Sequence, residues 1–144
     1  MKLCTLACSV LLPLVPAPPT AADAISAAAR QVGHTISAAC IATFTMSGST
    51  ALRAARERPD VPILGLTAKP GTARKLALLW GVHWVLTHDI STFTEMVQTA
   101  TEAARTEGMA EQGQRLVVTA GVAEVAAGSI AMEESYCRIK PDPL

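Results

Sequence analysis

Short apolar runs alternate with helical patterns along most of this sequence of 144 residues. Runs of roughly four to eight apolar residues are typical of strands that are buried on both faces of a sheet. Parallel strands need long crossover connections, which are usually helices, so the alternation predicts a three-layer α/β fold with helices on both faces of a mostly parallel, five-stranded sheet. The strands are expected at residues 39–45, 61–66, 83–87, 116–119 and 135–139.

Between these runs the apolar residues recur at three- and four-residue steps, which is the spacing of one helix face. Thr20 and Ser91 precede two of the patterns, where a hydroxyl can accept from the free amides of a first helical turn. The helices are expected at residues 21–37, 51–58 and 70–79, with a longer one after Ser91. Right-handed crossovers bring the carboxyl ends of the strands to one edge, where open α/β sheets bind ligands.

The length of the chain corresponds to one domain, which we place at residues 20–144. Residues 1–19 combine a single lysine, a short apolar run and several prolines. This run is too short to span a bilayer, and three interpretations of it stay open: a signal-like segment, a disordered leader, and a junction left from a longer gene. The expected location is the cytoplasm, or outside the cell if residues 1–24 act as a signal peptide.

The charged residues balance at 12 basic and 12 acidic side chains. This balance gives no electrostatic footprint for nucleic acid, and the chain has no basic run for an anionic membrane surface. The four cysteines form no CxxC pair, and such sparse cysteines do not indicate a disulfide framework. Cys40 lies within an apolar run and is expected to behave as a small buried hydrophobic residue.

A hydroxyl-rich turn at residues 45–50, between the first strand and the second helix, is the strongest candidate site. Glycine permits a close backbone approach there, and the amides at the start of a helix can receive a phosphate. The same pattern also fits a capped helix start without a ligand, and both interpretations stay open. The Walker A lysine and first glycine are absent, so nucleotide hydrolysis is not expected.

Other chemistry-bearing residues give weaker signals. His83 and His88 flank a strand, and Asp89 follows the second histidine, but a metal site needs another ligand and a shared face. The residues around Ser47 lack the first glycine of a nucleophile elbow. We therefore predict no catalytic residue and no metal site, and we keep a small phosphoester-binding α/β enzyme that uses His83 or His88 as an alternative.

Several segments in the right order resemble the C-terminal α/β domain of pyruvate kinase, over roughly five-sixths of the chain. Residues 45–48 resemble the family's Thr-x-Ser-Gly turn, and residues 54–59 resemble its Arg-x-Arg-Pro helix end. The remaining matches lie at residues 24–29, 62–67, 72–74, 81–82 and 117–122.

This resemblance implies a five-stranded sheet with five helices that contributes to a tetramer interface. It also implies that the 45–50 turn holds a phosphate of a sugar-phosphate effector, often fructose bisphosphate. The residues that would take this phosphate are Thr45, Ser47, Gly48, Ser49 and Thr50. The family's Mg²⁺ and K⁺ belong to a catalytic barrel that has no counterpart in this sequence, so we expect no cofactor in this chain and no pyruvate formation by it alone.

One segment departs from the family pattern. The effector loop of the family usually reads Gly-x-Pro-x-Gly and then Gly-x-Thr-Asn, whereas residues 121–131 here lack the Pro, one Gly, the Thr and the Asn. Glu124 adds a negative charge near any bound phosphate. The leading hypothesis is thus a stand-alone or truncated regulatory domain with a half-preserved effector site. The alternative is an interaction subunit that pairs with itself or with a separate pyruvate kinase chain.

Overall fold

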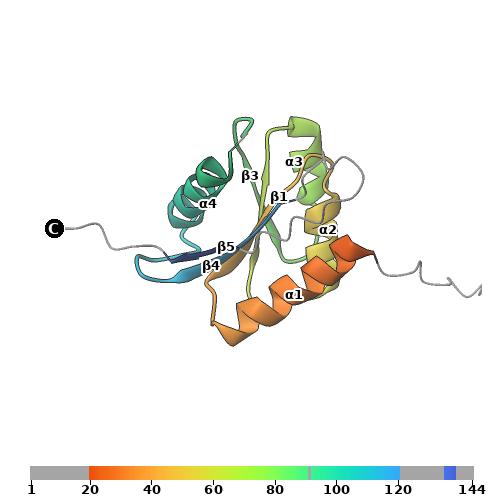
Figure 1. Ribbon diagram of the computed structural model, residues 1–144. Helices are drawn as coiled ribbons and strands as arrows, with labels where there is room; N and C mark the ends of the chain where they lie inside the picture. The colour runs from red at the N-terminus through yellow and green to blue at the C-terminus, as the bar shows by residue number, and fades with distance from the viewer. Residues whose placement is uncertain (1–19, 91, 121–134, 139–144) are drawn as a thin grey trace, which may run out of the picture.

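A twisted five-stranded sheet forms the centre of the computed structural model, which describes residues 20–90, 92–120 and 135–138 (Figure 1). The strand order is β3-β2-β1-β4-β5, with β1 to β4 parallel and β5 antiparallel to β4. The mostly parallel five-stranded sheet expected from the sequence is therefore confirmed. The strands are β1 (Cys40–Phe44), β2 (Ile63–Thr67), β3 (Val82–Leu86), β4 (Arg115–Ala120) and β5 (Ser135–Arg138).

Four helices lie among the described residues: α1 (Ala21–Thr35), α2 (Ser49–Arg56), α3 (Pro70–Leu76) and α4 (Phe93–Thr106). The resemblance implied five, and the described residues hold no further one. Thr20 caps α1 as expected, in a capping box with Asp23. The prediction that Ser91 caps α4 is wrong. The N-cap is the next residue, Thr92, whose hydroxyl accepts from the amide of Glu95.

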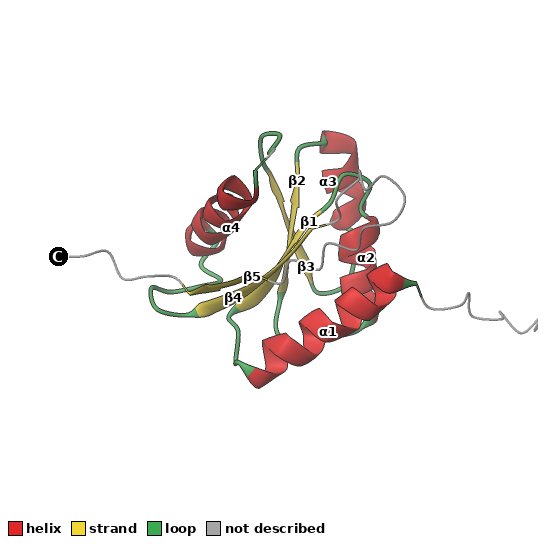
Figure 2. Ribbon diagram, in the orientation of Figure 1, coloured by secondary structure: helices red, strands yellow, loops and turns green. Residues whose placement is uncertain are grey.

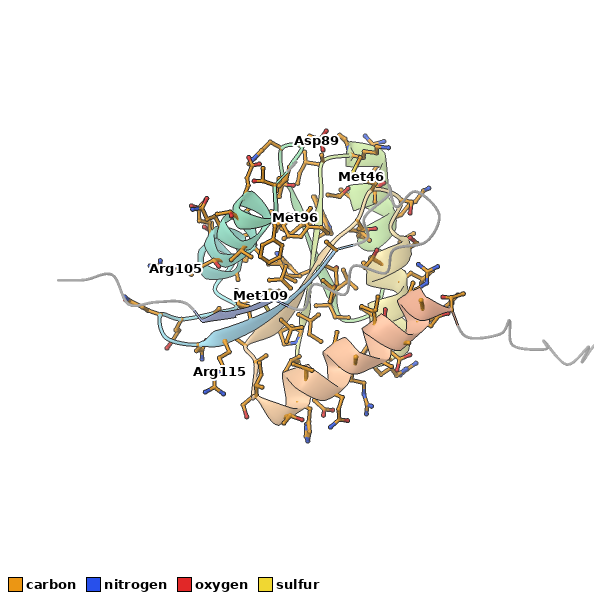
Figure 3. All side chains as sticks on the ribbon, in the orientation of Figure 1. Met46, Asp89, Met96, Arg105, Met109 and Arg115 are labelled. Carbon is orange, nitrogen blue, oxygen red and sulfur yellow. The ribbon has the colours of Figure 1, made fainter. Side chains whose placement is uncertain are left out.

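The helices divide unequally between the two faces of the sheet: α1, α2 and α3 cover one face, and α4 covers the other (Figure 2). The alternation of side chains along β1 explains this division. Ile41 packs with Ala29 and Val117 under α1, whereas Ala42 and Phe44 pack with Ala100 and Ala104 of α4. Figure 3 shows Met96 and Met109 on the α4 side of the sheet, where they fill the gap beside these small alanines.

Gly65 of β2 marks a point of very close packing. A Cβ atom there would lie 3.0 Å from Cδ1 of Leu76 and 3.1 Å from Cγ1 of Val82. The missing side chain lets the end of α3 settle directly onto the sheet, and Leu76 is completely buried as a result. This contact fixes the position of α3 over β2 and β3, next to the 45–50 turn.

The strand order reverses at β1. The chain moves outward from β1 through β2 to β3, and then α4 returns it to β4 on the other side of β1. The carboxyl ends of β1 and β4 therefore flank the switch point, the place where open α/β sheets form ligand crevices. The 45–50 turn follows β1 there, while the 121–131 loop and Glu124 lie outside the described residues, as does the 1–19 leader.

No helix in the described part of the chain is long and apolar enough to cross a membrane.

Candidate functional site

Thr45 anchors the 45–50 turn to the sheet. Its amide continues the β1–β2 ladder by donating to the carbonyl of Leu66 at 3.0 Å, and its hydroxyl accepts from the amide of Gly48 at 2.9 Å. The side chain is buried, with 6% of its surface exposed. Thr45 therefore stabilises the turn from its buried side, and its hydroxyl oxygen already accepts a hydrogen bond from the backbone of the turn.

Gly48 is the N-cap residue of α2 and has a φ of +95°. This left-handed conformation strains any residue with a Cβ atom, which explains the glycine at this position. The helix begins at Ser49, two residues before the expected start at residue 51. Since glycine has no side chain, α2 has no side-chain cap, in contrast to α1 and α4. The amides of Thr50 and Ala51, in the first turn, thus lack an intrahelical partner.

The remaining hydroxyls of the turn lie around these amides. The hydroxyl of Ser47 donates to that of Ser49 at 3.0 Å, and the amide of Ser49 donates to Ser47 Oγ at 3.4 Å. Both serines are exposed, and Thr50 is half-buried. Of the five predicted residues, Thr45 and Gly48 thus build the turn, whereas Ser47, Ser49 and Thr50 have hydroxyls that are exposed or half-buried.

The electrostatics of α2 also distinguish this helix start from those of α1 and α4. The first turns of α1 and α4 carry Asp23 and Glu95, whereas the first turn of α2 carries no acidic residue. A carboxylate at a helix start neutralises the positive end of the helix dipole. The start of α2 lacks this compensation from its own side chains, so an external anion is favoured there.

Arg53 does not face this helix start, because it lies in the last turn of α2 and pairs with a carboxylate of α1. Its Nε lies 3.2 Å from Oδ1 of Asp23. The hydroxyl and amide of Thr20 also donate to Asp23 at 2.6 and 2.8 Å. These bonds from Thr20, followed by the charge of Arg53, lower the pKa of Asp23 below its ordinary value. The pair joins α1 to α2 and leaves the binding of an anion to amides and hydroxyls.

Thr72 is a site residue that reasoning from the sequence did not assign. Its buried hydroxyl donates to the carbonyl of Met46 at 2.8 Å and so connects α3 to the middle of the 45–50 turn. Figure 3 shows Met46 above the carboxyl end of β1, next to α3. Thr72 belongs to a segment that matched the family pattern, but the sequence gives no signal that it contacts a residue 26 positions away.

The two histidines considered as catalytic candidates lie outside the 45–50 turn, and each contacts a glutamate. His83 Nε2 lies 2.7 Å from a carboxylate oxygen of Glu107, and His88 Nε2 lies 3.0 Å from one of Glu95. Within the described ranges, no cluster of three or more His, Cys, Asp or Glu residues could hold a metal ion. The structure therefore brings together the residues of the 45–50 turn, and it does not join either histidine to them.

The fold is an open α/β sheet, and the 45–50 turn lies at its switch point, where sheets of this class commonly bind ligands. The profile of the family "Pyruvate kinase, alpha/beta domain" matches residues 23–132. The chain is 46% identical over 104 residues to pyruvate kinase of Methylorubrum extorquens and 42% identical over 110 residues to that of Agrobacterium vitis. This chain belongs to the pyruvate kinase α/β domain family.

Solved structures agree with this assignment. Pyruvate kinase of Cryptosporidium parvum in complex with ADP superposes with a TM-score of 0.76 at 30% identity, over 87% of this chain and 25% of that one. Another crystal structure of the Cryptosporidium enzyme gives a TM-score of 0.73 at 26% identity over the same share of this chain. The matched regions cover 72% and 76% of this chain, but only 22% and 23% of the Methylorubrum and Agrobacterium proteins.

Proposed function

We propose that this chain is a regulatory module of the pyruvate kinase family that binds the phosphate group of a sugar phosphate at the 45–50 turn. The observation that carries the proposal is the start of α2, where Gly48 supplies no side-chain cap and the first turn has no acidic residue. Family membership supports the same site, because the turn keeps the Thr-x-Ser-Gly pattern. The position at the switch point of the sheet supports it independently.

The recognition would use neutral donors. In this proposal the amides of Thr50 and Ala51 donate to phosphate oxygens, and the hydroxyls of Ser47 and Ser49 turn from each other toward the ligand. Thr45 and Gly48 stabilise the conformation of the turn, and neither uses a side-chain donor to contact the phosphate. The dianion is favoured over the monoanion, since the positive end of α2 is the main source of field at the turn.

Calorimetric titration of the purified chain with fructose 1,6-bisphosphate tests the proposal. Binding is expected, and Ser49→Ala should weaken it by roughly 10- to 150-fold, because one charge-assisted hydrogen bond is worth roughly 1.5–3 kcal/mol. Thr106→Ala is the matched control: this hydroxyl lies at the exposed end of α4, and its loss should leave the affinity unchanged. Fructose without phosphate is the matched control ligand and should give no heat of binding.

Amide chemical shifts locate the ligand. Addition of the bisphosphate should move the amide resonances of Thr50 and Ala51 first, whereas the amide of Phe93, at the start of the side-chain-capped α4, should stay in place. Absence of binding, or binding that is unchanged in Ser49→Ala and leaves the α2 amides unperturbed, would reduce the 45–50 turn to a structural helix start.

A further inference from the structure

A hollow opens at the amino end of the sheet, opposite the end that carries the 45–50 turn. It lies where β2 and β3 begin and has a volume of about 290 Å³. An apolar cavity of roughly 150 Å³ holds a benzene molecule, so this hollow has room for two leucine side chains. Its walls are mainly apolar side chains: Pro59, Val61, Pro62, Ile63 and Trp80.

Trp80 is the largest side chain of the hollow and leaves 64% of its surface exposed. The guanidinium of Arg58 lies 5.3 Å from the centroid of the indole ring, and this cation–π contact holds the ring in place. Leu78, two residues earlier in the chain, is 86% exposed. Exposed apolar groups gathered around a concave surface are typical of a place where another segment of polypeptide binds.

Helix α1 connects the hollow to the segment at residues 1–19. At the carboxyl end of α1, His34 Nδ1 lies 3.3 Å from Oδ2 of Asp60, which also lines the hollow. A Cβ atom at Gly33 would lie 3.5 Å from Cγ2 of Val61. At the other end of α1, Thr20 is the N-cap. The 14 residues from Thr20 to His34 rise about 1.5 Å each, so the hollow lies about 21 Å along the helix from Thr20.

The sequence before Thr20 contains a spacer of matching length. Residues 13–19 include four prolines among seven residues. Proline-rich segments favour the extended polyproline II conformation, at about 3.1 Å per residue, so this spacer reaches about 22 Å. Residues 3–12, which precede the spacer, form an apolar run without a charged side chain. A spacer directed along α1 therefore brings the end of this run, Leu11 and Leu12, to the hollow.

We infer that the apolar run at residues 3–12 docks in the hollow of its own chain, with Leu11 and Leu12 against Trp80. The match between the reach of the spacer and the length of α1 selects this occupant. Docking removes the apolar surface of both leucines and of the indole ring from water, which is the main driving force for such a contact. The segment at residues 1–19 then covers the amino end of the sheet. This inference is independent of the phosphate-binding proposal.

Tryptophan fluorescence tests the contact in a Trp84→Phe background, which leaves Trp80 as the single tryptophan. Acrylamide quenching should become about twofold stronger when residues 2–12 are deleted, because the indole ring then loses its cover. Deletion of residues 14–18 keeps the apolar run but shortens the spacer to about 6 Å, and it should increase the quenching equally. Equal quenching in all three chains would overturn the inference.

Point variants test which part of the run docks. Leu11→Asp combined with Leu12→Asp places two charges in the apolar hollow and should increase the quenching as much as the deletion does. Thr5→Asp is the matched control, since it adds a charge at the far end of the same run and should leave the quenching unchanged. An equal increase in Thr5→Asp would contradict the placement of Leu11 and Leu12 against Trp80.

Nuclear Overhauser effects in the unsubstituted full chain locate the contact without any variant. Cross-peaks are expected between the methyl groups of Leu11 or Leu12 and the ring of Trp80. In a mixture of isotope-labelled and unlabelled chains, these cross-peaks should arise within one chain and should not depend on protein concentration. Cross-peaks between chains, absence of the cross-peaks, or a mature protein that lacks residues 1–24 would overturn the inference.

Discussion

Thr72 and Met46 are joined by a hydrogen bond of 2.8 Å that ties the first turn of α3 to the loop above β1. Thr72→Val keeps the shape of the side chain but leaves the Met46 carbonyl without this donor. We expect the free energy of unfolding to fall by about 1 kcal/mol, the usual value of such a bond. Urea denaturation measures the change. Thr106→Val, at the exposed end of α4, is the matched control and should change stability by less. Equal effects of both substitutions would contradict a specific role for Thr72.

The two glycines at the starts of α2 and α3 should respond to alanine in opposite directions. Gly48→Ala places a Cβ atom on a backbone with φ of +95° and should cost roughly 1–3 kcal/mol of stability. Gly71 lies in the first turn of α3, has no positive φ, and has open space where its Cβ atom would be. Gly71→Ala should therefore stabilise by roughly 0.4–1 kcal/mol. Thermal unfolding followed by circular dichroism compares the two, and a shift of the same sign in both would contradict the assigned geometry.

Asp23 should make the stability of the domain sensitive to acid. Hydrogen bonds from Thr20 and the charge of Arg53 lower the pKa of this carboxyl below its ordinary value of 3.8. A carboxyl with a depressed folded pKa contributes stability above its unfolded pKa and loses this contribution as the pH falls through the folded pKa. The stability of Asp23→Asn should therefore fall less steeply below about pH 4.

The carboxyl carbon resonance of Asp23, followed by NMR during an acid titration, reports its pKa directly. Thr20→Ala removes the hydroxyl that is the largest cause of the shift, and the pKa should move back toward the ordinary value. An identical titration curve in the wild-type chain and in Thr20→Ala would show that the hydroxyl does not have this effect.

Cys40 should resist alkylation in the native protein. Its side chain is completely buried in β1, and this burial raises the pKa of the thiol to about 11. Iodoacetamide at pH 8 should leave Cys40 unmodified in the folded chain and should modify it in urea, because only the thiolate reacts. Peptide mass mapping distinguishes this position from the other cysteines. Rapid modification in native buffer would contradict the burial.

The sequence predicted the sheet well because its parallel strands are buried on both faces. Residues 61–66 and 116–119 read as continuous apolar runs, and only strands with two covered faces require them. Helix boundaries were predicted less well, because they depend on single backbone conformations. The choice of Thr92 over Ser91 as a cap, and of Gly48 as the start of α2, rests on the φ and ψ angles of single residues.

The sequence indicated the 45–50 turn as the candidate site, but it did not distinguish the roles of the individual residues in the turn. The cluster of hydroxyls around Gly48 was the signal for this turn, and by that signal Thr45 and Ser49 are equivalent. Only the fold shows that the hydroxyl of Thr45 accepts from Gly48 under the turn while Ser49 is exposed. The bond from Thr72 depends on α3 lying next to the 45–50 turn, a contact between distant segments that local patterns do not encode.

The central position of β1 links the 45–50 turn to folding cooperativity. β1 is paired on both sides, and all five of its residues are buried between α4 and the helices of the other face. The amide of Thr45 joins the turn to the β1–β2 pairing. Local unfolding that displaces Thr45 therefore also breaks a backbone hydrogen bond of the central strands. A ligand bound there would therefore act on the global unfolding equilibrium and raise the melting temperature of the whole domain, by an amount that grows with the logarithm of the ligand concentration above Kd.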